Sequence, residues 1–263
     1  MSNPEFAPRL VALDVDGTLV DWDNQMTEAV RDAVGKVVAA GVPVVVSTGR
    51  AVPGVMDVLG LLGLEEGIAV ASNGAVVFGF GPFEVLLAVT FDARAVVQLL
   101  LEHVPQAHVA VEEVGRGYRI NKPFPIGEIT GEMTVQSVEE LLAEPVTRVI
   151  IRSPESSVQD FDELVGRLGL HGINYYVGYT AWLDLAPEGV SKESGLAFVA
   201  DRLGVDRADV LAIGDGRNDL EMLRWAGRGV AMGGSPPEVR SASDDVTEPI
   251  EADGVAVELA RWF

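Results

Sequence analysis

Two carboxylates close to the N-terminus are the residues best suited to chemistry. Asp14 and Asp16 follow a short apolar run, Leu10 to Leu13, and Gly17 and Thr18 come directly after them. Apolar residues that lead into turn residues predict a buried strand that ends in a loop. At such a strand end, one carboxylate can act as a nucleophile, the other as a general acid or base, and a divalent metal ion can lie between them.

Two simpler interpretations compete. Asp-x-Asp-Gly is also typical of a plain turn, because Asp and Gly both favour turns. A calcium-binding loop of the EF-hand type requires Gly at its sixth position and Glu at its twelfth. Counted from Asp14, these positions hold Leu19 and Gln25, so the calcium loop is excluded. From this stretch alone, the plain turn remains an alternative interpretation.

The composition describes a globular, acidic protein. The chain has 263 residues, enough for one large domain or two small ones, and 48% of them are hydrophobic. The net charge of -21 argues against binding to nucleic acid or anionic membranes, which requires a basic face. If the substrate is an anion, the site must be locally positive, so a metal ion and a few fixed cations have to supply that charge.

No apolar run approaches the length of a membrane span, and MSNPEFAPR lacks the pattern of a signal peptide. We therefore expect a soluble, cytoplasmic protein, either a monomer or a homodimer. Cysteine is absent, which excludes disulfides and thiol catalysis.

The elements that must position the carboxylates alternate between strand and helix at both ends of the chain. This alternation predicts an α/β fold, a Rossmann-like, doubly wound parallel sheet. The predicted strands are 10–14, 42–47, 68–71, 210–213 and 229–232, the predicted helices are 27–40, 52–62, 192–203 and 219–226, and 75–78 with 84–89 form a hairpin.

The middle of the chain has a different pattern, which predicts an inserted α+β domain with its own sheet. Helices are expected at 92–103, after a capping box formed by Ser137 and Glu140, and at 158–168. Strands are expected near Val109 and Arg119, at 146–152, and at 174–178 and 182–186, the last two antiparallel. We predict a core of residues 1–88 plus 188–263 and an insert of 89–187.

Polar groups follow several of these elements, and one parallel sheet would bring them to one edge. The second strand ends in Ser47, Thr48, Gly49 and Arg50, Lys192 lies near a helix start, and GDGRND spans 214–219. Asp14 and Asp215 offer hard oxygen ligands for Mg²⁺, and Thr48 and Lys192 can bind phosphate oxygens. Separately, each piece has a structural explanation: Arg50 can pair with a carboxylate, and Asn73 can simply tolerate a left-handed turn.

As a set, these motifs resemble the haloacid dehalogenase superfamily of phosphatases. The resemblance rests on DxDGT at 14–18, Thr48 in STGR, Lys192 in GVSKESGL, and Asp215, Asn218 and Asp219 in GDGRND. The position of the insert is that of a type-two (C2B-like) cap. The strings STGR, SNGA, GVSK and GDGRND are similar to the Cof-like subfamily, although Gly234 stands where that subfamily commonly has a polar residue.

The resemblance implies a role for each motif residue. Asp14 would attack phosphorus, and Asp16 would protonate the leaving alcohol and then activate water. Mg²⁺ would be held by the Asp14 carboxylate, the Asp16 backbone carbonyl and Asp215, with Asp219 close by or acting through water. Thr48 and Lys192 would hold the phosphoryl group, with support from Asn218.

We therefore expect a Mg²⁺-dependent phosphatase acting on a small phosphorylated metabolite, a sugar phosphate, with the cap as a mobile lid. A phosphotransferase or phosphomutase on the same fold and a non-catalytic binding module are the alternatives. Arg119, Asn121 and Lys122 are candidate cap contacts, for which an exposed surface is the favoured interpretation. No role is assigned to His103, His108 or His171.

Overall fold

The computed structural model describes residues 6–169, 173–177 and 181–263. Residues 1–5, His171 and Gly178 lie outside the described residues, and with them most of the N-terminal stretch and the end of one predicted strand. Within the described part of the chain, no helix is long and apolar enough to cross a membrane.

The core is a parallel five-stranded sheet in which the first strand lies near the centre. Its strand order is β14 (Asp245–Val246), β13 (Arg228–Ala231), β12 (Val210–Gly214), β1 (Leu10–Leu13) and β2 (Val44–Val46). Leu13 is in register with Ile213 on one side and with Val46 on the other. The chain therefore leaves these three strands at the same edge of the sheet, as the motifs require.

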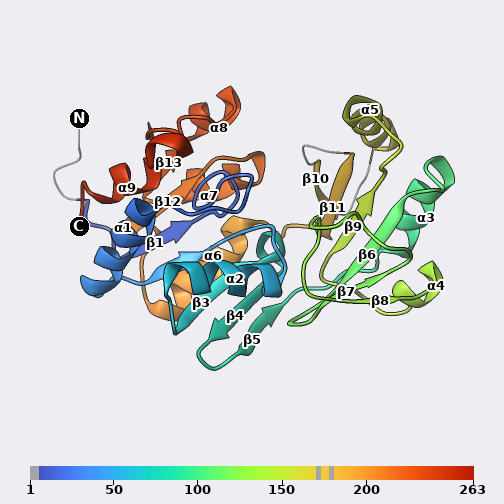
Figure 1. Cartoon of the computed structure of the whole chain (residues 1–263), viewed down its shortest axis with the longest axis horizontal. Coiled ribbons are helices and arrows are strands. Elements are labelled where there is room, and N and C mark those ends of the chain that lie inside the picture. The colour runs from blue at the N-terminus through green and yellow to red at the C-terminus, as the bar shows by residue number, and fades with distance from the viewer. Residues whose placement is uncertain (1–5, 170–172, 178–180) are drawn as a thin grey trace.

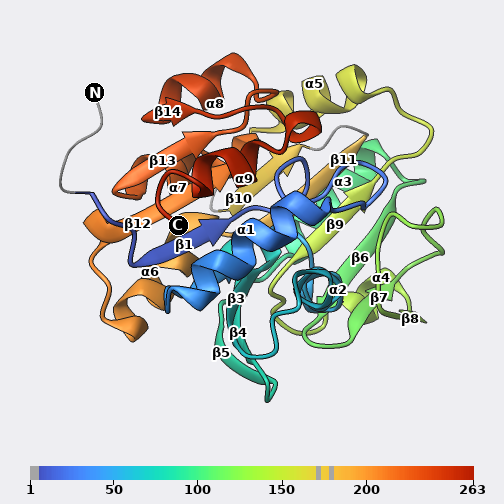
Figure 2. The same ribbon diagram turned by 60° about the vertical axis from the view of Figure 1, so that its left-hand side comes forward.

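Helices cover both faces of this sheet, because side chains alternate along a strand. Val11 and Leu13 belong to one hydrophobic cluster, and Leu10 and Ala12 belong to another. The first cluster contains α1 (Glu28–Ala39), α2 (Val52–Leu62) and α9 (Gly254–Leu259), and Figure 2 shows α1 and α9 over β1. The second contains α6 (Lys192–Leu203), α7 (Leu220–Trp225) and α8 (Pro237–Ala242).

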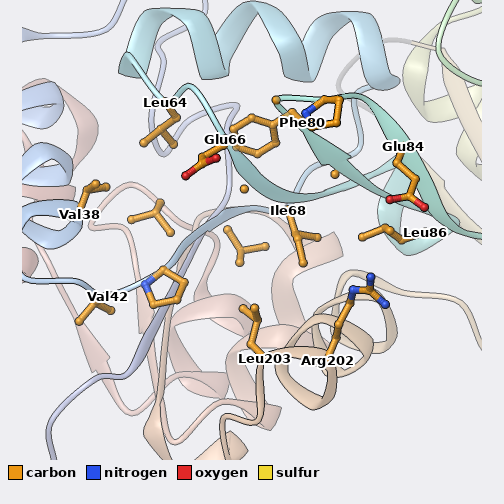
Figure 3. Close-up of a pocket in the computed structure, with 17 residues that line it drawn as sticks. Val38, Val42, Leu64, Glu66, Ile68, Phe80, Glu84, Leu86, Arg202 and Leu203 are labelled. Carbon is orange, nitrogen blue, oxygen red and sulfur yellow. The ribbon is translucent and has the colours of Figure 1, made fainter.

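The third predicted strand belongs mainly to a different sheet. β3 (Gly67–Ala71) pairs antiparallel with β4 (Val76–Phe80), which pairs with β5 (Glu84–Ala88), so the predicted hairpin is present. A parallel bridge between Ser47 and Val70 connects β3 to β2. At their N-terminal ends the two strands border a groove of about 470 Å³. Figure 3 shows its mostly aliphatic lining. Thr48 and Asn73 follow the opposite, C-terminal ends of these two strands.

The insert forms a six-stranded mixed sheet beside the core (Figure 1). Its strand order is β10 (Ile173–Val177), β11 (Trp182–Pro187), β9 (Val149–Arg152), β6 (His108–Glu113), β7 (Gly117–Ile120) and β8 (Glu132–Val135). β10 and β11 are antiparallel as predicted, whereas β8, parallel to β7, was not predicted.

One face of the cap sheet packs on helices and the other faces the core. Val149 and Leu183 share a hydrophobic cluster with α3 (Arg94–His103) and α5 (Val158–Leu168). Ile150, one position along, clusters instead with Ala51 of the core. The predicted capping box is present at α4 (Val138–Leu141).

Candidate active site

The loop after β1 places its two carboxylates in different environments. The backbone N–H groups of Thr18, Leu19 and Val20 all donate to the Val15 carbonyl oxygen, at 3.2, 2.9 and 3.0 Å. This tight loop leaves Asp14 only 3% exposed, whereas the Asp16 side chain is 47% exposed. One carboxylate is therefore sheltered from water and the other is open to the cavity above it.

Gly17 is required inside this loop for two reasons. Its φ is +82°, in the region that disfavours side chains. A Cβ atom at this position would also lie 2.3 Å from the Asp215 Oδ2 atom. The glycine of the DxDGT motif therefore lets the Asp215 carboxylate approach the loop that carries Asp14.

Lys192 connects two buried carboxylates from opposite ends of the sequence. It is the first residue of α6, and its side chain is fully buried. The Nζ atom donates to Oδ1 of Asp14 and to Oδ1 of Asp219, both at 2.6 Å. Because an ammonium group has three N–H donors, these two bonds leave one donor over.

Asp219 has partners on both carboxylate oxygens. Lys192 occupies Oδ1, and Oδ2 accepts the backbone N–H groups of Asp215 and Gly216 at 3.0 and 2.9 Å. The GDGRND loop at 214–219 therefore closes around the Asp219 side chain. Asp219 is better placed to hold this loop and Lys192 than to offer a direct bond to a metal ion.

The acidic cluster contains more negative than positive charge. Carboxylate oxygens of Asp14, Asp215 and Asp219 lie within 4.8 Å of one another. Burial raises the pKa of Asp14 well above its usual range, and the neighbouring Asp219 adds to this rise. Burial and Asp219 likewise raise the pKa of Asp215 to about 7. Burial acts to lower the pKa of Lys192, but Asp14 and Asp219 outweigh it, so that pKa is raised.

This donor set fits a divalent metal ion. Hard carboxylate oxygens with raised pKa values indicate a place where additional positive charge would be stabilised. Asp14 and Asp215 are the residues suited to hold Mg²⁺ directly, because both oxygens of Asp219 are engaged. Asp219 would then act as a neighbour of the ion, as the sequence interpretation allowed.

The remaining motif residues lie around the same cluster. Thr48 is fully buried, and its Oγ1 accepts the backbone N–H of Arg50 at 3.1 Å, which leaves the hydroxyl hydrogen to donate. Asn218 donates through Nδ2 to the Asn73 Oδ1 atom at 3.0 Å. Asn73 has the left-handed conformation expected of a turn, with φ 52°, but it also lines the cavity.

Arg50 pairs with the exposed carboxylate of Asp16, as the structural interpretation of Arg50 suggested. Nη2 lies 2.6 Å from Asp16 Oδ1 and Nε lies 3.1 Å from Asp16 Oδ2. Nη2 also donates to Oδ1 of Asn24 at 2.9 Å. A bidentate pair of this kind fixes the direction in which the Asp16 carboxylate points.

A cavity of about 1040 Å³ lies between core and cap and contains both sets of residues. Asp14, Asp16 and Asp215 line it from the core. From the cap, it is lined by residues that include Tyr118, Arg148, Tyr175, Tyr176, Trp182 and Asp184. These cap residues were not singled out in the sequence.

The three candidate cap contacts, Arg119, Asn121 and Lys122, are not among the residues that line this cavity, and a contact role was not the favoured interpretation of them. Asn121 bonds to the backbone of Val109 and Ala107, and Lys122 donates to the Gln106 carbonyl. Arg119 does not line the cavity, although its neighbour Tyr118 does, because successive side chains of a strand point to opposite faces of the sheet.

Comparisons with known proteins agree with this geometry. Residues 11–259 match the family of haloacid dehalogenase-like hydrolases. The 5-amino-6-(5-phospho-D-ribitylamino)uracil phosphatase YitU of Bacillus subtilis is 29% identical over 98% of this chain and 99% of its own length. The phosphoglycolate phosphatase of Methanothermobacter thermautotrophicus is 28% identical over 97% and 99%.

Solved structures show the same similarity in three dimensions. The phosphatase BT1666 of Bacteroides thetaiotaomicron superimposes with a TM-score of 0.81, at 27% identity, over 100% of this chain and 97% of that one. The sugar phosphatase BT4131, of subclass IIB, has the same TM-score at 21% identity, over 96% and 98%, and shares the fold. The chain belongs to the haloacid dehalogenase-like hydrolases.

Proposed function

We propose that this chain is a Mg²⁺-dependent phosphatase that hydrolyses a small phosphorylated metabolite, a sugar phosphate, through an aspartyl-phosphate intermediate. The observation that carries the proposal is the pairing of a sheltered carboxylate, Asp14, with an accessible one, Asp16, beside a buried lysine. A nucleophile needs a fixed, ionised oxygen, and a proton carrier needs access to substrate and water.

In the first step, a carboxylate oxygen of Asp14 forms a bond to phosphorus while the bond from phosphorus to the leaving oxygen breaks. Asp16, in its protonated form, gives its proton to that leaving oxygen. In the second step, Asp16 takes a proton from water, the water oxygen bonds to phosphorus, and Asp14 is released as a carboxylate. Phosphate and the free alcohol are the products.

The surrounding residues hold the transferred group in place. Lys192 can direct its third N–H at a phosphoryl oxygen while it keeps Asp14 and Asp219 fixed. Thr48 and Asn218 offer a hydroxyl and an amide to the same group. Mg²⁺, held by Asp14 and Asp215, would supply positive charge against the phosphoryl oxygens, which the acidic walls of the site otherwise repel.

Phosphate release by the purified protein tests the proposal. We expect hydrolysis of p-nitrophenyl phosphate and of several sugar phosphates with Mg²⁺, and none with EDTA or in Asp14→Asn. Free phosphate should appear at the same rate with and without an added sugar, whereas a transferase would phosphorylate that sugar. Unchanged turnover in Asp14→Asn would exclude the proposed nucleophile.

A further inference from the structure

The face of the cap sheet that lines the active-site cavity carries three polar residues in contact. Tyr118 lies on β7, Asp184 lies on β11, and Arg148 directly precedes β9. Leu183 and Leu185, on either side of Asp184, pack instead into the cluster with α3 and α5. The alternation along the strands therefore directs these polar groups to the same cavity as Asp14 and Asp16.

Arg148 is held at the centre of this group. Its side chain is only 6% exposed. Nε and Nη2 donate to the two carboxylate oxygens of Asp184 at 2.7 and 2.9 Å, and Nη1 donates to the Tyr118 hydroxyl at 2.9 Å. The guanidinium is thus neutralised and fixed in orientation. Together the three residues offer hydrogen-bond donors and acceptors without excess positive charge.

The charge of the cavity wall disfavours a second anionic group on the substrate. The described lining residues include the carboxylates of Asp14, Asp16, Asp21, Asp57, Glu128, Asp184 and Asp215, but only three cations, Arg50, Arg148 and Arg217. Each of these arginines is already paired, with Asp16, Asp184 and Glu238 respectively. Lys192, behind the wall, is engaged by Asp14 and Asp219.

Aromatic rings next to these polar groups complete the cap side of the cavity. Trp182, Tyr175 and Tyr176 line it. Tyr176 is directly opposite Asp184 in the sheet register. Burial raises the pKa of Tyr176, and the nearby carboxylate of Glu221 adds to this rise. Ring faces beside fixed hydrogen-bonding groups suit a carbon chain that carries hydroxyl groups.

We propose that Tyr118, Arg148 and Asp184 form a leaving-group subsite that accepts an uncharged, hydroxyl-rich group and rejects one that carries a second negative charge. The subsite rests on the proposed phosphatase function and deepens it. Hydroxyl groups of the substrate donate to Asp184 and exchange hydrogen bonds with Tyr118. A carboxylate in the same position would face Asp184 without a cation to receive it, because Arg148 is already neutralised.

A matched pair of substrates tests this inference on the unmodified protein. D-glucitol 6-phosphate and 6-phosphogluconate have the same carbon chain and differ in a terminal hydroxyl or carboxylate. We expect kcat/KM for glucitol 6-phosphate to be higher by roughly tenfold or more, since like charges brought together weaken binding strongly. Each compound is also titrated against p-nitrophenyl phosphate, so that binding is measured even where turnover is slow.

Two variants assign the selectivity to the subsite. Asp184→Asn removes the carboxylate that bonds to Arg148 and leaves Glu112 as the negative charge that acts on the guanidinium, so the preference for glucitol 6-phosphate should fall. Asp57→Asn is the matched control, because it removes one carboxylate from the same cavity wall without releasing any of the three arginines of that wall, and it should keep the preference. If Asp184→Asn fails to fold, Tyr118→Phe replaces it, with an expected rise in KM for glucitol 6-phosphate relative to p-nitrophenyl phosphate.

The outcomes separate the two proposals. If p-nitrophenyl phosphate is hydrolysed but 6-phosphogluconate is used equally well or better, the subsite is refuted and the phosphatase function stands. If neither six-carbon compound is hydrolysed or competes with p-nitrophenyl phosphate, the subsite is also refuted. If none of the three compounds releases phosphate, the phosphatase function fails, and the subsite fails with it.

Discussion

The buried lysine is the most direct test of the charge balance in the site. In Lys192→Met, an unbranched apolar side chain of similar length replaces a fully buried ammonium group. The carboxylates of Asp14 and Asp219, each 2.6 Å from the Nζ atom, then lose their common cation. Removal of one partner from a buried ion pair destabilises a protein by about 3–5 kcal/mol, so we expect a loss of this size in the free energy of unfolding.

Urea denaturation in EDTA measures this loss. Arg217→Met is the control, because it removes the cation of an exposed pair with side chains 71% and 44% accessible. The control should lose less than about 1 kcal/mol, since exposed pairs are screened by solvent. Mg²⁺ should restore part of the stability of Lys192→Met, and so should a lower pH, at which the carboxylates bind protons. If Lys192→Met in EDTA is no less stable than Arg217→Met, the reasoning about compensated buried charge is refuted.

Three further outcomes follow from the same site. Asp14→Asn should lower hydrolysis of p-nitrophenyl phosphate by at least roughly a thousandfold, while circular dichroism shows an intact fold; a smaller loss would contradict its role as nucleophile. In EDTA, stability should fall as the pH rises from 4 to 7, because Asp215 has a pKa of about 7 in the folded protein and an ordinary one when unfolded. The native state thus binds more protons over this range, and Asp215→Asn should flatten the dependence in urea denaturation. Gly74→Ala should destabilise the protein by at least about 2 kcal/mol in the same assay, because φ is +97° and a Cβ would lie 1.9 Å from the Ser191 carbonyl oxygen; an unchanged midpoint would show that the turn relaxes.

The core of the site could be predicted because the carboxyl ends of parallel strands lie at the same edge of the sheet. Once β1 and β12 pair with Leu13 opposite Ile213, the residues that follow them must be neighbours. Lys192 joins Asp14 and Asp219 because α6 begins beside the same edge. Local sequence patterns are therefore sufficient to predict these site residues: each strand is an apolar run that ends in a turn with a polar residue.

The cap residues could not be predicted in the same way. Tyr118 and Arg119 are neighbours on β7, so they lie on opposite faces of the cap sheet. An error of one position in the predicted strand register is therefore enough to assign the wrong residue to the cavity. The partner of Arg148 lies 36 residues further along the chain, and no local pattern indicates that pairing. Three elements near the C-terminus, α8, β14 and α9, were also missed, because segments of two to six residues are too short to show a period.

The contact between Gly74 and Ser191 has a consequence for how the chain assembles. Val89, where the chain leaves the core, donates to the carbonyl of Ala75, and Ser191, where it returns, lies against Gly74. The insert is therefore attached at two adjacent points. Leu10 and Val210 pair across 210 − 10 = 200 positions of sequence, and closing so long a loop of flexible chain is entropically unfavourable. If the insert folds early, its two ends lie side by side, and the loop that remains to be closed is effectively shorter. β12 is then already close to β1, so the cap would aid the folding of the core as well as cover its cavity.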